Sequence, residues 1–416
     1  MSTIAEPLRL ACGATLRNRL AKASMSEQLA DRGGAPSDDM IRLYERWGRG
    51  GAGLLLSGHV MIDARHVAEA GNVVVEDERG IDALTRWVRG ASAQGAHAWL
   101  QLNHPGRQTP RLFDPAPVAP SVVPLEVGGG AFAAPRALAE GEIWDLVERF
   151  ARAAAIAERA GATGVEIHGA HGYLVSQFLS PTTNRRRDAW GGDATRRRRF
   201  LLEVTRAIRG AVAPGFAVAV KLNSADFQRG GFGDDDALEV IEALGDERVD
   251  LLEVSGGTYE RAVMFGESAP ESTRRREAFF LDFAERARSV ARMPLMLTGG
   301  FRTRSAMDAA LASGAVDVIG MARPLAVEPE LPAALLGGTS LGAHTPRLAT
   351  GWKTLDSIVT GAWYQAQIRR MGRGLDPSAS LSRGGALVSY VGELLRHGSS
   401  GLRRRRGFDP TSGGVT

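Results

Sequence analysis

Short apolar runs alternate with longer amphipathic stretches along most of the chain. The runs are rich in Val, Ile, Leu and Ala, and each precedes a helical pattern, which is typical of parallel strands joined by crossover helices. Eight strands are expected, at Leu20–Met25, Gly53–Gly58, Ala96–Asn103, Gly164–His168, Ala217–Asn223, Asp250–Ser255, Pro294–Thr298 and Val316–Gly320. Eight alternations that close on themselves predict an α/β fold, a single (β/α)8 TIM barrel.

The helical stretches have clear apolar faces. One helix is expected to begin after Ser37, a good N-cap, and its apolar positions share one face: Met40, Leu43, Tyr44 and Trp47. A second helix is expected from Thr195 to Val212, with four arginines at its start, and a third from about Trp144 to Ala160. The spacing of three and four residues predicts that these helices cover the barrel.

Two segments depart from the regular alternation. The gap between Asn103 and Gly164 contains a long Pro- and Gly-rich loop after strand three, and a loop of this length is usually functional. Beyond the barrel, residues 1–336, the pattern loosens into a helical extension, residues 337–400, with helices expected at Leu355–Arg373 and Ala386–Arg396. We expect the arginine-rich tail, residues 401–416, to be mobile because it has little apolar content.

Composition excludes several classes of protein. The 416 residues are 44% hydrophobic, enough for a large core, and the net charge is only +4, so the basic balance does not indicate a nucleic-acid partner. Cys12 is the only cysteine, which excludes an internal disulfide and any four-thiolate metal site. We find no signal-like start and no run of ~18 apolar residues. We therefore expect a cytoplasmic protein without a membrane partner.

The richest polar cluster follows the fourth strand. In TIM barrels the active site lies at the carboxyl ends of the strands, and GVEIHGAHGYL places His168, His171 and Tyr173 there. Two imidazoles can bind one carbonyl oxygen, and a phenol beside them can deliver a proton. The HxxH spacing also allows a metal site or a structural role, but it lacks the glutamate of HExxH and a nearby carboxylate. We expect no metal.

Glycines and an arginine follow the last two strands. The segment TGGFRT after strand seven contains Gly299 and Gly300, and GMARPL at the end of strand eight contains Arg323. Loops at these two places commonly build a phosphate site in TIM barrels. A GG pair alone indicates only a tight turn, but its position opposite an arginine favours a phosphorylated ligand.

Two lysines lie in predicted strands, in a chain with 48 arginines and only three lysines. Alternation places Lys221 on the same face of strand five as Ala217, Ala219 and Asn223. A compact ammonium suits a narrow barrel mouth where a planar guanidinium does not, although chance placement is the competing interpretation. Lys22, in strand one, faces away from Ala23, and its pattern assigns it no role.

Several segments, in chain order, resemble the Old Yellow Enzyme family of FMN-dependent ene-reductases. They are NRLAKASM, GAGLLLSGHV, QLNHPGR, GVEIHGAHGYLVSQFLSPTTNRRRDAWGGD, KLNSADFQRGGF, EVSGGTYE, LTGGFRT and IGMARPL. The resemblance spans about Leu8 to Leu336 and is most specific at strand four. It implies a (β/α)8 barrel, FMN as the phosphorylated ligand and NADPH or NADH as electron donor.

The resemblance also implies roles for residues along the flavin. Ser24, Met25 and Ser26 pass its edge, with Ser26 near the C4 carbonyl. Gly58 lines the ring and Gln101 binds the pyrimidine edge. Position 26 often carries Cys or Thr in relatives, so Ser26 is expected to shift the redox potential without abolishing binding.

Other roles concern the charged ends of the cofactor. Lys221 takes the place of a cation, usually Arg, beside flavin N1 and O2, where it stabilises the reduced flavin. Gly299, Gly300, Ala322 and Arg323 hold the phosphate. Relatives that reduce dienoyl-CoA carry an iron–sulfur cluster, which the single cysteine excludes here.

The implied reaction reduces an α,β-unsaturated carbonyl compound, an enone or enal. NAD(P)H reduces the flavin, and hydride then passes to Cβ of a substrate whose oxygen binds His168 and His171, while Tyr173 protonates Cα. Pocket-wall candidates are Asn103, Phe227, Tyr259 and Phe301. The preferred nicotinamide cofactor and the oligomeric state are left open, and a homo-oligomer is plausible.

Two alternatives compete with this interpretation. A tRNA dihydrouridine synthase is also an FMN barrel, and the arginine runs at 185–187, 196–199 and 403–406 suggest it. That family uses a cysteine acid, however, and Cys12 precedes strand one. A flavin-binding protein without turnover is the second alternative, and the intact set of His168, His171 and Tyr173 argues against it.

Overall fold

The fold is described from a computed structural model. It describes residues 3–127, 129–258, 260, 277–344, 346, 353–390 and 392. For residues 353–358 it describes the backbone but not the side chains. The predicted tail, residues 401–416, lies outside this range, as do Tyr259 and residues 391 and 393–396 of the second predicted extension helix. None of the described helices is long and apolar enough to cross a membrane.

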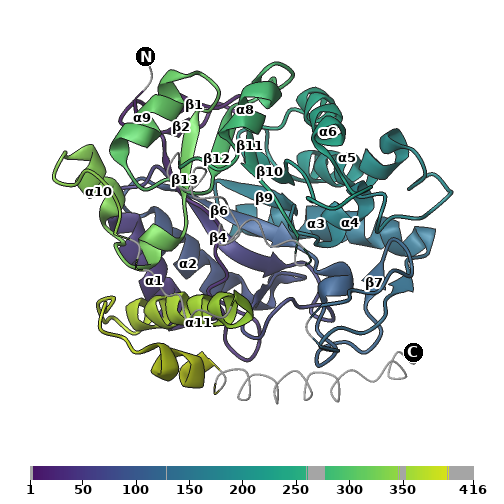
Figure 1. Cartoon of the computed structure of the whole chain (residues 1–416), viewed down its shortest axis with the longest axis horizontal. Coiled ribbons are helices and arrows are strands. Elements are labelled where there is room, and N and C mark those ends of the chain that lie inside the picture. The colour runs from purple at the N-terminus through teal and green to yellow at the C-terminus, as the bar shows by residue number, and fades with distance from the viewer. Residues whose placement is uncertain are drawn as a thin grey trace.

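Eight parallel strands close into a barrel (Figure 1). They are β3 (Leu20–Lys22), β4 (Leu54–Met61), β6 (His97–Asn103), β9 (Gly164–Gly169), β10 (Ala217–Asn223), β11 (Leu251–Ser255), β12 (Leu295–Thr298) and β13 (Val318–Met321). Each strand pairs with the next in this order, and β13 pairs with β3 to complete the ring. The predicted TIM barrel is confirmed, with all eight strands in the expected places.

The strand ends differ from the prediction at two points that matter for the site. The first strand was expected to reach Met25, but β3 ends at Lys22, because the chain leaves the barrel wall after Ala23 to form a loop. The second strand was expected to stop at Gly58, but β4 continues to Met61. It does so through a bulge, since the register with β6 shifts between Leu56 and His59.

Helices cover the outside of the barrel. They are α1 (Asp38–Arg49), α2 (Ile81–Ser92), α3 (Glu140–Arg159), α4 (Leu174–Leu179), α5 (Ala194–Ala211), α6 (Asp234–Asp246), α8 (Leu281–Arg288), α9 (Arg304–Ala312) and α10 (Leu331–Leu336). Ser37 caps α1 as predicted, accepting a hydrogen bond from the Met40 amide, and the predicted apolar face of this helix is buried. The third predicted helix begins at Glu140, not Trp144, because the Glu142 side chain accepts from the Ala139 amide and starts the helix earlier.

The arginines at the start of α5 have partners, which accounts for cations at an unfavourable helix end. Asp193 caps the helix by accepting from the Arg196 amide at 2.8 Å. Arg197 and Arg198 form ion pairs with Asp236 and Glu239 of α6. These residues therefore join two neighbouring helices instead of forming a free basic surface.

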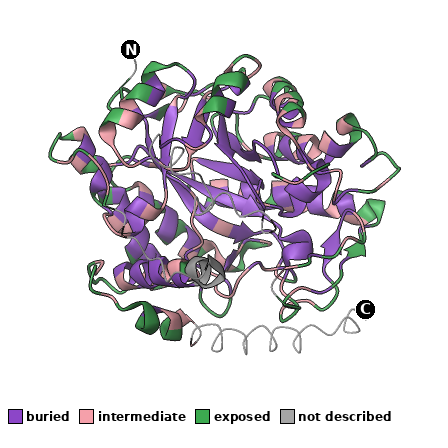
Figure 2. Cartoon of the chain, viewed as in Figure 1, coloured by how far each residue is buried: buried purple, intermediate pink, exposed green. Residues whose placement is uncertain are grey.

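The core has two layers. Small and apolar side chains fill the barrel interior, and they include Ala21, Ala23, Leu54, Leu56, Trp99, Ala217, Ala219, Leu251, Met296 and Val318. A larger cluster fills the space between the strands and the surrounding helices. Figure 2 shows the buried strands at the centre and exposed residues on the outer loops and helix faces. Alternation along each strand thus separates the interior from the helix layer.

The remaining elements are short, apart from one long helix. The short strands are β1 (Leu8–Arg9), β2 (Thr15–Leu16), β5 (Val73–Val74), β7 (Val118–Ala119) and β8 (Arg136–Ala137). The 3-10 turns are η1 (Glu78–Gly80), η2 (Gly106–Gln108) and η4 (Arg323–Ala326). The long loop after the third barrel strand contains η2, β7 and β8, so it is structured.

The long helix is α11 (Lys353–Gly372), close to the predicted Leu355–Arg373. It lies along α1 on the outside of the barrel (Figure 1). Arg42 of α1 donates to the Gly372 carbonyl at 2.8 Å, and Trp363 donates to the Leu381 carbonyl at 3.0 Å. Residues 383–390 are also helical. The described part of the extension therefore packs on its own barrel.

Candidate active site

The three residues predicted as catalytic meet at the carboxyl end of β9. The His168 ring lies 5.1 Å from the His171 ring and 4.8 Å from the Tyr173 ring, measured between centroids. His171 adopts a left-handed conformation, with φ of 61°. Its amide donates to Asn223 Oδ1 at 3.2 Å, and its Nε2 lies 2.8 Å from Ser255 Oγ. The ends of β10 and β11 thus fix the ring of a residue that follows β9.

Both histidines are neutral. Burial lowers the pKa of His168 well below its ordinary value, and the neighbouring His171 lowers it further. Burial likewise lowers the pKa of His171, with Lys221 adding to the effect. His168 Nδ1 accepts from the Ala170 amide at 3.3 Å, so the neutral ring carries its proton on Nε2. A neutral imidazole of this kind donates one hydrogen bond to a carbonyl oxygen.

A third histidine, His59, belongs to the same cluster and was missed from the sequence. Its Nε2 lies 3.3 Å from Tyr173 Oη, and its ring stacks on His168 with centroids 5.4 Å apart. Simple alternation from Leu54 and Leu56, which face the barrel interior, points His59 away from the interior. The bulge in β4 inserts an extra residue and reverses that direction. Nothing in the sequence except the glycine before His59 signals this bulge.

Next to the histidines lies a row of polar side chains from neighbouring strands. Ser24 Oγ donates to Gln101 Oε1 at 2.7 Å, and Gln101 Nε2 donates to Glu166 Oε2 at 2.6 Å. Lys221 Nζ donates to Glu253 Oε1 at 2.8 Å. All of these residues except Ser24 are buried. The predicted positions Ser24, Gln101 and Lys221 therefore belong to one polar group inside the barrel, joined through two glutamates that were not predicted.

The pKa values of the two glutamates are shifted in opposite directions. Burial and the neighbouring Glu253 raise the pKa of Glu166 well above its ordinary value. For Glu253, burial also acts to raise the pKa. The charge of Lys221 and the hydrogen bond from Glu166 outweigh burial, so the pKa of Glu253 is lowered. Lys221 therefore favours the charged form of Glu253, and the charge of Glu253 in turn opposes ionisation of Glu166.

The loop that contains Met25 and Ser26 is anchored from below. Glu27 is buried and accepts two hydrogen bonds from the Gly58 amide, at 3.0 and 3.2 Å. A Cβ on Gly58 would lie 2.2 Å from Glu27 Oε2 and from the Met25 carbonyl, so only glycine fits there. Ser26 Oγ contacts the Glu69 carboxylate, and the Ser26 carbonyl accepts a hydrogen bond from Gln365 of α11. The extension thus reaches the predicted flavin edge.

The predicted phosphate site lies at the ends of two neighbouring strands. Thr298 of β12 pairs with Gly320 of β13, so Gly299 and Gly300 lie close to the turn that Ala322 and Arg323 begin. Both glycines have positive φ, 137° and 88°, and a Cβ on Gly300 would lie 2.7 Å from the Phe279 ring. Neither position tolerates a side chain.

These features agree with comparisons with known proteins. A model of the NADH:flavin oxidoreductase / NADH oxidase family matches residues 3–340. The chain belongs to this family. A curated relative, an NADH-dependent flavin oxidoreductase of Hypocrea jecorina, is 39% identical over 376 residues, which cover 83% of this chain and 93% of the relative.

Solved structures agree with the family assignment. An Old Yellow Enzyme homologue from Zymomonas mobilis has a TM-score of 0.70 and 26% identity, covering 82% of this chain and 95% of the homologue. Morphinone reductase in complex with tetrahydroNAD has the same TM-score and identity, with coverage of 83% and 93%. The resemblance to the Old Yellow Enzyme family is confirmed, and so is the prediction of an FMN oxidoreductase that uses a nicotinamide donor.

The residues of this flavin oxidoreductase fit the cofactor of its family. Two glycines with positive φ follow β12, close to the turn after β13 that contains Arg323, and they form a cradle that a Cβ would fill. The amide of Gln101 and the hydroxyl of Ser24 supply donors and acceptors for a pyrimidine edge. The Lys221 ammonium bonds one oxygen within the described part of the chain, which leaves donors for an anionic ring.

A second polar cluster is formed by residues that follow β4 and β6. Asp63, His66 and His104 bring possible metal ligands within 4.8 Å of one another. However, His104 Nδ1 accepts from the Gly106 amide at 3.0 Å, so the neutral ring carries its proton on Nε2 and has no free lone pair for a metal. Arg65 binds both oxygens of Asp63. We interpret this cluster as a polar network that holds the loop after β6.

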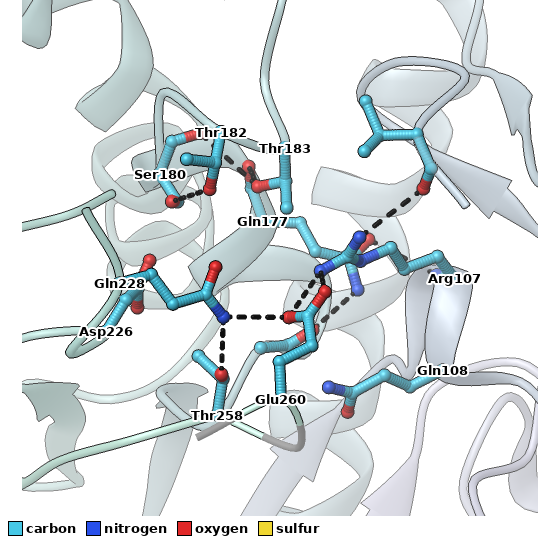
Figure 3. Close-up of polar contacts among 12 residues, drawn as sticks. Arg107, Gln108, Gln177, Ser180, Thr182, Thr183, Asp226, Gln228, Thr258 and Glu260 are labelled. Carbon is cyan, nitrogen blue, oxygen red and sulfur yellow. Dashed lines mark hydrogen bonds and ion pairs between the residues drawn. The ribbon is translucent and has the colours of Figure 1, made fainter. Parts of the chain in front are cut away.

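A polar cleft, which Gly172 helps to line, borders the site. Figure 3 shows polar contacts among the residues around it. Arg107 of η2 donates to both oxygens of Glu260, at 3.0 and 2.9 Å, and Gln228 Nε2 donates to Glu260 Oε2 at 3.0 Å. Gln228 also donates to Thr258 at 3.0 Å. Loops after β6, β10 and β11 are thereby joined around the mouth of the barrel.

The predicted pocket walls are placed unequally. Asn103 contacts His59, with Nδ2 3.2 Å from Nδ1, and so belongs to the site. Phe227 is 47% exposed beside the mouth, whereas Phe301 is buried. Tyr259 lies outside the described residues. Two further arginine runs were noted in the sequence. The run at 185–187 includes Arg186, which forms an ion pair with Asp188. The run at 403–406 lies outside the described residues.

Proposed function

We propose that the chain is an NADH-dependent ene-reductase that reduces the C=C bond of enones and enals. The observation that carries this proposal is the cluster of His168, His171 and Tyr173, in which two neutral imidazoles and a phenol converge at the barrel mouth. The resemblance to an Old Yellow Enzyme homologue and to morphinone reductase supports it, and the names of curated relatives favour NADH as the donor.

Residues around the mouth hold the cofactor. Ser24, Met25 and Ser26 would hold the edge of the flavin, and Gly58 would line its ring. Gln101 binds the pyrimidine edge, because its amide lies buried between Ser24 and Glu166. When bound, FMN supplies the hydride that it receives from NADH.

The charged parts of the cofactor have their own partners. Lys221 places an ammonium beside the anionic part of the ring and is itself held by Glu253. Gly299, Gly300, Ala322 and Arg323 bind the phosphate through backbone amides and a guanidinium. Together these residues would hold the flavin beside the histidines, where it would supply hydride to a bound substrate.

The catalytic residues act on the substrate. His168 and His171 donate hydrogen bonds to its carbonyl oxygen, where negative charge develops as hydride adds to Cβ. Neutral imidazoles suit this task because each can donate a hydrogen bond through its N–H without carrying the extra proton that an imidazolium ion would lose. Tyr173 transfers its hydroxyl proton to Cα and regains a proton from water. The products are the saturated carbonyl compound and NAD⁺.

The test separates the two half-reactions. The protein is loaded with FMN, reduced anaerobically with NADH or NADPH, and reoxidised with 2-cyclohexenone while the flavin spectrum is followed. Tyr173→Phe should slow reoxidation by the enone roughly a hundredfold or more, the usual contribution of a positioned acid, and leave reduction by NADH unchanged. Equal loss in both half-reactions would contradict the role of Tyr173, and failure of 2-cyclohexenone and enals to reoxidise the wild-type flavin would overturn the proposed function.

A further inference from the structure

Two carboxyl groups meet inside the barrel, next to Lys221. Glu166 and Glu253 are both 0% exposed, and their side chains are hydrogen-bonded to each other. Gln101 Nε2 donates to Glu166 Oε2 at 2.6 Å, and Lys221 Nζ donates to Glu253 Oε1 at 2.8 Å. The remaining oxygens, Glu166 Oε1 and Glu253 Oε2, are buried as well. Neither glutamate has a part in the proposed reaction.

The contact between the two carboxyl groups requires a proton. Two carboxylates only accept hydrogen bonds, so a bond between them forms when one of them is protonated. The electrostatic surroundings agree with this, because burial and Glu253 raise the pKa of Glu166. Against the effect of burial, Lys221 lowers the pKa of Glu253. Since the two groups are coupled, the proton belongs to the pair and not to one residue.

The groups around the pair leave Lys221 as its nearest cation among the described residues. Thr298 of β12 adds a neutral hydrogen bond to Glu253. The charge of Lys22 acts on both Glu253 and Lys221, but its ammonium pairs with Glu27 at 3.5 Å. Burial is the main cause that lowers the pKa values of the neighbouring histidines, which are therefore neutral near pH 7: His59, His168 and His171.

We propose that Glu166 and Glu253 share one proton and so oppose Lys221 with a single negative charge, which sets how strongly the site favours reduced over oxidised FMN. Reduced flavin carries more negative charge than oxidised flavin, so an ammonium favours it and a carboxylate opposes it. One carboxylate balances Lys221, whereas two would leave a net negative charge buried beside the ring. Both glutamates act through Lys221 and are positioning residues. The inference rests on the place that the proposed function gives to the flavin, beside Lys221.

The shared proton is measured without turnover. The infrared absorption of protonated carboxyl groups in the FMN-loaded wild type is compared with that in Glu166→Gln and in Glu253→Gln. Each variant leaves one carboxyl group near Lys221 with no second carboxylate to oppose its ionisation, so both should lose one protonated carboxyl group. Glu27 and Glu69 also have pKa values that burial raises, but they lie outside the pair and cancel in the subtraction.

The effect on the flavin is measured as its reduction potential, by titration against a reference dye. The double variant Glu166→Gln with Glu253→Gln removes the negative charge that opposes Lys221. It should favour reduced over oxidised FMN about tenfold more than the wild type does, which raises the potential by about 30 mV for a two-electron couple. Each single variant keeps one carboxylate and should stay closer to the wild type. Lys221→Met should lower the potential.

Several outcomes would overturn the inference. They are an unchanged infrared absorption in either single variant, a wild-type potential in the double variant, a double variant shifted no further than the single ones, and an unchanged potential in Lys221→Met. The infrared comparison needs only the single variants, which keep a counter-ion for Lys221, so it decides the matter even if the double variant does not fold. Failure of the proposed function gives a different result: the wild type would not reduce 2-cyclohexenone, while the infrared absorption and the potential would still shift as expected.

Discussion

Two buried lysines show how the wall of this barrel differs from its mouth. Lys22 of β3 points outward into the helix layer, where its Nζ lies 2.8 Å from the Leu56 carbonyl, 3.2 Å from Tyr44 Oη and 4.4 Å from the centre of the Trp47 ring. Lys221 of β10 points inward, and within the described chain it bonds one oxygen, on Glu253. Both ammonium groups are at most 4% exposed and both have a glutamate partner.

The two lysines differ in how many donors of the ammonium group have a partner within the protein. At Lys22 the protein supplies every partner: a carbonyl, a phenol, an aromatic face and the Glu27 carboxylate. Glu27 in turn holds the Gly58 amide, so this closed group fixes the base of the Ser24–Ser26 loop. Among the residues that the structure describes, Lys221 bonds one oxygen beside a row of polar groups, which leaves donors of its ammonium for a ligand. We infer that a buried charge with a complete set of partners is structural, whereas one with an incomplete set faces a ligand.

The largest expected effect is on the wall. Lys22→Met keeps the volume of the side chain but leaves the Glu27 carboxylate buried without its cation. Breaking a buried pair in this way should lower the free energy of unfolding by about 3–5 kcal/mol, as measured by urea denaturation. A loss of less than about 1 kcal/mol in the free energy of unfolding would show that the Lys22 charge contributes little to stability.

The double variant Lys22→Met with Glu27→Gln is the matched control. Removing both charges leaves no unpaired ion, so it should be more stable than Lys22→Met alone. It should also show weaker FMN binding if the Glu27 carboxylate is what holds the Gly58 amide and the loop above it. Equal stability of the single and double variants would contradict the view that the unpaired carboxylate is the source of the loss.

The two lysines also show how far sequence reasoning reaches. Strand periodicity placed Lys221 on the same face as Ala217 and Ala219 and placed Lys22 opposite Ala23, both from alternation alone. The structure shows that these three alanines line the barrel interior, so Lys221 points inward and Lys22 outward. The partners of Lys22 come from Tyr44, Trp47 and Glu27, which only the packing of α1 on β3 brings together. The structural role of Lys22 could therefore not be predicted from the strand pattern.

His59 and the helical extension were unpredictable for related reasons. The direction of His59 depends on a bulge of one residue, which reverses alternation locally and leaves almost no mark in composition. The contact between Gln365 and the Ser26 carbonyl joins residues 339 positions apart. By contrast, His168, His171 and Tyr173 follow one strand end, and Gly299, Gly300 and Arg323 follow two neighbouring ones. Sites built at strand ends are readable because the barrel order itself brings them together.

The next effect concerns the mouth. Lys221→Met should weaken FMN binding roughly tenfold to a hundredfold, because it removes a charged donor from the anionic part of the ring. The loss should be seen in a titration of the FMN-free protein with FMN, followed by flavin fluorescence. Lys221→Arg keeps the charge and should bind FMN more tightly than Lys221→Met. An unchanged affinity in Lys221→Met would remove the contrast between the two lysines.

The smallest expected effect is a pH dependence confined to the wall. Burial lowers the pKa of Lys22 from 10.5 to about 8, against the opposing influence of Glu27. Between these two values the unfolded chain binds more protons at this position than the folded chain does. The stability of the wild type should therefore rise with pH across this window, by at most about 1.4 kcal/mol per pH unit from this group.

The double variant Lys22→Met with Glu27→Gln serves as the reference, because it lacks both titrating groups of the pair and cancels the pH dependence of the rest of the chain. Tyr44, whose pKa burial raises well above 10, keeps its proton throughout the window. The difference in unfolding free energy between wild type and double variant, measured by urea denaturation at several pH values from about 7 to 10, should shift in favour of the wild type as pH rises. A difference that stays flat would mean that Glu27, Tyr44 and the Leu56 carbonyl compensate fully for burial of the ammonium. A difference that moves in the opposite direction would mean that these partners stabilise the charged form beyond its stability in water.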